Sequence, residues 1–85
     1  MDTIKVKQIF NKFLSEEPTI VGNAGSLFWI KEKLVAFLNV NKYDSNRFTF
    51  VIRIPVPEKN SEIEVLRQEL ELNEKERCTL KLKFS

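Results

Sequence analysis

The chain has 85 residues, of which 42% are hydrophobic and 31% are charged, with 14 lysines and arginines against 12 acids. This length predicts a single domain over residues 1–85, and the composition excludes disordered and low-complexity classes. A net charge of +2 is too small to indicate a nucleic-acid partner by long-range attraction alone.

The use of cysteine and histidine excludes several kinds of site. One cysteine, Cys78, cannot form an intrachain disulfide, and a chain without histidine offers it no imidazole base and supplies too few ligands for zinc. Most of the glutamates between Glu62 and Glu76 fall on an expected helix and turn, where they are solvated instead of converging in a pocket. We therefore expect no enzymatic activity, cofactor, metal or small-molecule substrate. Cys78 is expected to be a small core residue.

Two further features bear on location. The longest purely apolar run, Leu34 to Leu38, is far shorter than the ~20 residues of a membrane helix, and the first ten residues lack a signal-peptide pattern. The lone cysteine suits a reducing compartment. We expect a cytoplasmic protein that makes no membrane contact.

The amino-terminal segment has the spacing of an amphipathic helix. Its apolar residues fall at i, i+3, i+4, i+7 and i+8, Asp2 or Thr3 can serve as N-cap, and Pro18 disfavours helix at the residue before it. The stretch that follows, "PTIVGNAGS", holds both glycines of the chain and predicts a tight loop. The apolar helix residues are Val6, Ile9, Phe10, Phe13 and Leu14.

Three runs with a period of two residues come next: "SLFWI", "LVAFLNV" and "RFTFVIRIPV". They predict an antiparallel meander whose middle strand is apolar on both faces, and Pro55 and Pro57 end the run because proline has no backbone N–H to donate.

The last third of the chain is ambiguous. Ser61-x-x-Glu64 is a capping-box pattern, and Ile63, Leu66 and Leu70 follow at helical spacing, so residues 61–71 are predicted to be a second helix. A competing interpretation takes residues 69–72 as a strand, which "NEKE" turns into a hairpin with the final segment. That segment alternates Cys78, Leu80, Leu82 and Phe84 with Thr79, Lys81 and Lys83, and predicts a half-buried strand.

The predicted fold is α+β, a two-layer α/β sandwich in the order α-β-β-β-α-β, with a three-stranded antiparallel meander, a C-terminal strand and both helices on one face. The place of the last strand in the sheet stays open.

Two short helices cover one face of such a sheet and leave the other available. Its expected occupants include Val35, Phe37 and Val51 at the centre, with either Leu27 and Trp29 or Phe28 and Ile30 from the first strand. Arg47, Arg53, Lys81 and Lys83 are expected to form a cationic rim.

Three interpretations of this face follow. Arginine and lysine stems shield the apolar centre and the face binds nothing; or the face binds a protein, either another chain or a second copy in a homodimer; or it binds RNA or single-stranded nucleic acid. We expect a small non-catalytic protein-interaction or regulatory module that binds its partner through Val35, Phe37, Val51 and Trp29. The alternative is nucleic-acid binding through Arg47, Arg53, Lys81, Lys83 and Phe37.

Overall fold

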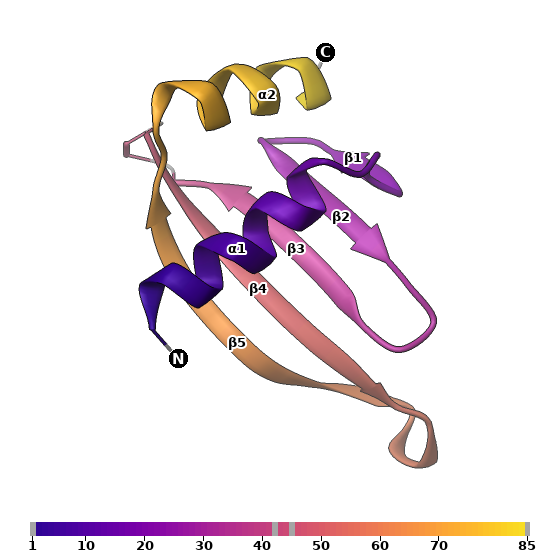
Figure 1. Cartoon of the computed structure of the whole chain (residues 1–85). Coiled ribbons are helices and arrows are strands. Elements are labelled where there is room, and N and C mark those ends of the chain that lie inside the picture. Colours follow the sequence, from indigo (N-terminus) through magenta and orange to yellow (C-terminus); the bar gives the residue numbers. More distant parts are fainter. Residues whose placement is uncertain (1, 42, 45, 85) are drawn as a thin grey trace.

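The computed structural model describes residues 2–41, 43–44 and 46–84 (Figure 1). The fold is α+β, and five strands form one open antiparallel sheet in the order β1-β2-β3-β4-β5, so each strand pairs with its neighbours in sequence. The class and the antiparallel meander of the three middle strands are confirmed. The elements are α1 (Thr3–Leu14), β1 (Ile20–Gly22), β2 (Ser26–Ile30), β3 (Val35–Val40), β4 (Arg47–Val56), a 3-10 turn η1 (Pro57–Lys59), β5 (Ser61–Glu71) and α2 (Glu74–Phe84).

Helix α1 forms as its sequence predicts. The side chain of Asp2 accepts a hydrogen bond from the backbone N–H of Lys5 at 2.9 Å, which confirms Asp2 as the N-cap. The helix ends at Leu14, before the acidic pair and Pro18. Its apolar stripe is buried, with Val6 and Phe10 fully inaccessible, and the helix crosses one face of the sheet (Figure 1).

The glycine-containing stretch after α1 is not only a loop. Ile20 to Gly22 form β1, a short edge strand, and the chain then turns back into β2 through Ala24 and Gly25, which have φ angles of 60° and 74°. A Cβ on Gly25 would lie 2.8 Å from a methyl carbon of Val40. Glycine is required there for both backbone conformation and space.

The second predicted helix is wrong, because residues 61–71 form strand β5, which pairs with β4 from Arg47↔Glu71 to Val56↔Ser61. The reason lies in a register shift at Ile52/Arg53. A bulge adds one residue to a strand. Ile63 and Leu66, three residues apart, therefore oppose Ile54 and Ile52 on the same face, a spacing that imitates a helical turn.

The predicted C-terminal strand is also wrong, because residues 74–84 form helix α2. Asn73 and Glu76 cap this helix reciprocally: each backbone N–H donates to the side-chain oxygen of the other, at 3.0 and 2.8 Å. Acids occupy the first turn and lysines the last, which suits the helix dipole. These interactions at the helix ends outweigh the strand-like alternation of residues 78–84. Of the apolar residues in that alternation, the helix buries only Leu80.

One apolar cluster forms the core. From α1, Phe10 packs edge-on against Phe50 with ring centroids 5.5 Å apart, and Phe13 lies 5.9 Å from Trp29. Helix α2, at one end of the sheet in Figure 1, contributes Leu80, which is 1% exposed. The other buried members are Val6, Leu14, Leu27, Ala36, Leu38, Phe48, Ile52, Leu70 and Leu72.

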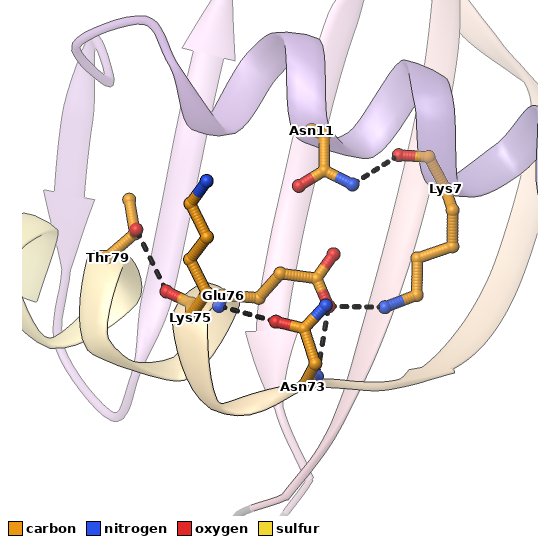
Figure 2. A network of polar contacts seen from close by, with 6 residues as sticks. All are labelled: Lys7, Asn11, Asn73, Lys75, Glu76 and Thr79. Atoms are coloured by element: carbon orange, nitrogen blue, oxygen red, sulfur yellow. Dashed lines mark hydrogen bonds and ion pairs between the residues drawn. The ribbon is translucent and has the colours of Figure 1, made fainter.

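Glu76 connects the two helices (Figure 2). Besides capping α2, its carboxylate accepts a 2.5 Å hydrogen bond from the ammonium of Lys7 on α1, and the Glu76 side chain is 4% exposed. Burial acts to raise the pKa of this carboxyl, but the hydrogen bonds from Lys7, from the Asn73 backbone and from Asn11 outweigh it and hold the pKa below its ordinary value. Glu76 is therefore ionised in the folded protein at neutral pH.

The first prediction concerns the β1–β2 turn. Gly25→Ala should lower the free energy of unfolding by about 1–2 kcal/mol or more, since it adds left-handed strain to a close contact with Val40. Ala24→Gly, at the neighbouring left-handed residue, is the matched control and should not destabilise the protein. Urea unfolding measures both, and equal effects would contradict this account of the turn.

The second prediction concerns acid stability. Because the pKa of Glu76 is lower in the folded than in the unfolded chain, its contribution is present above about pH 4.3 and is lost as the pH falls through the lower, folded value. Glu76→Gln keeps a capping side chain but removes the charge, and should cost about 1–3 kcal/mol at pH 7.

The difference in unfolding free energy between wild type and Glu76→Gln should shrink as the pH falls below about 4.3 in urea titrations. In a Lys7→Met background the same substitution should cost much less at pH 7. A difference that does not change with pH would show that the charge of Glu76 has no such role.

Candidate interaction surface on the sheet

The side of the sheet that faces away from the core cluster is called the open face here. Strand registers place Phe28, Phe37, Val51 and Arg67 in one row across it, on β2, β3, β4 and β5. None of these four residues belongs to the core cluster. By alternation along the strands, Ile30, Val35, Asn39, Arg47, Thr49 and Arg53 lie on the same side.

Val35, Phe37, Val51, Arg47 and Arg53 therefore lie on the face where the sequence placed them. The register of β2, which the sequence left open, brings Phe28 and Ile30 to this face. Whether these residues bind a partner stays a prediction.

Trp29 does not lie on the open face, so its predicted role there is wrong. Its side chain is 2% exposed in the core, and its indole N–H donates to the carbonyl of Glu16 at 3.1 Å. A buried indole requires such an acceptor, and the turn after α1 supplies it. The neighbouring backbone N–H of Ile30 donates to the hydroxyl of Thr19, which fixes β2 against the same segment.

Lys81 and Lys83 were expected on the rim of this face and lie instead on α2. Lys83 forms an ion pair with Glu17 at 3.0 Å, beyond the end of α1. Their placement on the sheet was wrong because the alternating segment that carries them is helical. Cys78, expected in the core of the same strand, is exposed on α2.

The centre of the open face is apolar. The rings of Phe28 and Phe37 pack with centroids 4.7 Å apart and planes inclined by 40°, while Ile30 beside them is 47% exposed. Val51 is fully inaccessible although it lies outside the core cluster. It stands between Phe37 and Arg67 in the strand registers, so an aromatic ring and an arginine stem flank it.

The sequence prediction placed residues 61–71 in a helix and assigned none of their charges to this face. As strand β5 they add charges to it. Glu69 binds the guanidinium of Arg47, and Glu64 accepts from Arg67 at 2.6 Å. The hydrogen bond with Glu69 raises the pKa of Arg47, and the hydrogen bond with Arg67 lowers the pKa of Glu64. The alternation of residues 69–72 was a sequence signal for Glu69 on a strand, but no signal placed Glu64 there.

The charges that β4 and β5 contribute to the open face nearly cancel. The residues that β4 and β5 direct to the open face include three arginines and four glutamates. They are Arg47, Arg53, Arg67, Glu62, Glu64, Glu69 and Glu71. The open face thus has an apolar half on β2 and β3, and a half on β4 and β5 whose charges nearly cancel.

A cavity of about 420 Å³ lies apart from this face, between α2 and the ends of β3 and β4. Its apolar lining is Val40, Phe48, Leu80 and Phe84, and Arg77 enters it with one guanidinium nitrogen hydrogen-bonded to Asn46 at 2.7 Å. No part of the sequence predicted this cavity, since it depends on α2 being a helix.

Among the described residues, no group of three or more histidine, cysteine or acidic side chains is arranged to hold a metal ion. Neither helix of the described chain has the length and apolar character needed to cross a membrane. A comparison of the chain with protein-family models, curated proteins and solved structures finds no match.

The third prediction tests the register that places Trp29. The chain has a single tryptophan, so native fluorescence should show a blue-shifted emission maximum and weak quenching by acrylamide, because the indole is buried under α1. Both should change to the values of the free amino acid on unfolding in urea. Native quenching as strong as that of the unfolded chain would place Trp29 on the open face and overturn the register of β2.

Proposed function

We propose that this protein is a small, non-catalytic protein-interaction module that binds a second copy of itself through the open face. In this proposal the helices and the sheet act as two layers, with both helices on the core side, so that a contact on the open face need not disturb the core. The single cysteine favours a reducing compartment, and we place the module in the cytoplasm.

The observation that carries the proposal is the packed pair Phe28 and Phe37 on the side away from the core. Burying one such side chain from full exposure contributes about 1.5–3 kcal/mol, and the parts of these two rings that are still exposed would contribute a share of it on binding. Small domains have total stabilities of only about 5–10 kcal/mol, so a cluster of apolar residues on this face is a large contribution. Face-to-face packing of two sheets buries rows of this kind against each other.

The charge balance permits a second copy as the occupant. On the open face β4 and β5 carry three arginines and four glutamates, a net charge of −1, so repulsion between two whole faces is weak. A two-fold axis that runs across the strands brings the apolar half of one face onto the apolar half of the other. The glutamates of β5 then face those of the second copy, with Arg47 and Arg53 one strand away, so the apolar half and not the charges provides the attraction. A polyanion would meet more acids than bases on the same surface, and the ion pairs of Arg47 and Arg67 already engage their guanidinium groups.

The fourth prediction is that sedimentation equilibrium at tens of micromolar shows a homodimer, which Phe37→Glu converts to a monomer. A carboxylate introduced at the centre of the interface would be buried without a partner. Circular dichroism and urea unfolding should show that the monomeric variant keeps its helices.

Ile4→Glu is the matched control, since Ile4 is 73% exposed on α1 and its replacement adds the same charge far from the open face. It should leave the dimer intact. A wild-type chain that sediments as a monomer at high concentration would overturn the proposal. RNA binding, the alternative from the sequence, predicts instead that a single-stranded RNA pool binds the monomer at low salt and that Arg47→Ala and Arg53→Ala weaken it.

A further inference from the structure

Strand β5 ends the sheet, and its outer side is an edge eleven residues long. Within the described chain, β4 is the one strand that pairs with it (Figure 1). Alternate backbone N–H and C=O groups of an edge strand point outward and can pair with an added strand. The first five residues of β5, Ser61 to Val65, are all exposed, so this end of the edge is accessible.

The side chains of β5 that point to the open face form an acidic row. Four glutamates and one arginine lie in this row, a net charge of −3. The row is Glu62, Glu64, Arg67, Glu69 and Glu71. The arginines that offset it, Arg47 and Arg53, stand one strand further in on β4, so the row nearest the edge is the negative one.

The opposite side of β5 is mainly apolar, with Ser61 at its start and Gln68 between Leu66 and Leu70. Leu70 is buried in the core, Leu66 packs partly against it, and Ile63 is 54% exposed opposite Ile54. Val65, at the irregularity of the strand, is 52% exposed. An incoming strand would therefore meet carboxylates on one of its faces and apolar side chains on the other.

We propose that the outer edge of β5 binds an extended segment of another protein in which lysine or arginine alternates with apolar residues. The added strand continues the sheet through backbone hydrogen bonds. Its basic side chains lie beside the glutamates of the open face, and its apolar side chains lie beside Ile63, Leu66 and Leu70.

The same acidic row gives the edge its selectivity. Two β5 edges brought together would combine net charges of −3 each, which opposes pairing between copies of this chain. A basic strand gains from the charges that repel a second β5. The proposal concerns the edge of the sheet and does not depend on the dimer formed through the open face.

The test is fluorescence anisotropy with a labelled eight-residue peptide of alternating lysine and valine at low salt. We expect saturable binding. Two control peptides separate strand addition from simple attraction: one has the same composition with lysines and valines in pairs, and the other carries N-methyl groups on alternate residues, which remove the backbone donors but keep every charge. Both should bind at least about fivefold more weakly.

On the protein side, Glu62→Gln with Glu71→Gln should weaken binding of the alternating peptide about fivefold. Glu16→Gln with Glu32→Gln changes the net charge equally on the β2 side of the molecule, away from the edge, and should have little effect. Hydrogen exchange should slow at backbone amides of residues 61–71 when the peptide binds. Phe37→Glu should leave peptide binding unchanged, which separates this proposal from the homodimer. Equal binding of all three peptides, or no binding of any, would overturn it.

Discussion

The pairing of β4 with β5 determines most of what is distinctive in this fold. β4 has ten residues and pairs along its whole length, so the charged sequence after the 3-10 turn becomes a strand even though it carries helical signals. Without this pairing, Phe48, Phe50 and Ile52 would form the margin of the sheet, and Leu70 would not complete the core beside them. The pairing also places the arginines of β4 next to glutamates, which removes the cationic character that the arginine row alone would have.

The amino-terminal two thirds of the fold could be predicted from sequence because local and tertiary preferences agree there. In α1, the apolar stripe, the Asp2 cap and the stop before Pro18 all indicate the same helix. The alternation of β2, β3 and β4 likewise matches the burial that each strand has. Only β1 was missed, since three residues beside two glycines carry little signal.

The last third could not be predicted because its local signals oppose its tertiary environment. The bulge in β5 brings Ile63 and Leu66 to one face at a helical spacing, and the capping pattern at Ser61 is unused. In α2 the alternation of lysines and leucines suggests a strand, while the caps at Asn73 and Glu76 and the link to Lys7 favour a helix. The candidate surface inherits both errors. Val35, Phe37 and Val51 were placed on the correct face, but Trp29, Lys81 and Lys83 were assigned to it as well, and the glutamates of β5 were not.

The bond between Lys7 and Glu76 joins residues 69 positions apart, whereas every strand pairs with the strand that follows it in the chain. Closing a long loop has a larger entropic cost than forming a hairpin. Folding is therefore expected to proceed from successive hairpins, with the docking of α2 onto α1 as a late event. A contact that is absent from the folding transition state mainly raises the barrier against unfolding. The Lys7–Glu76 contact between the two helices therefore lengthens the lifetime of the native state.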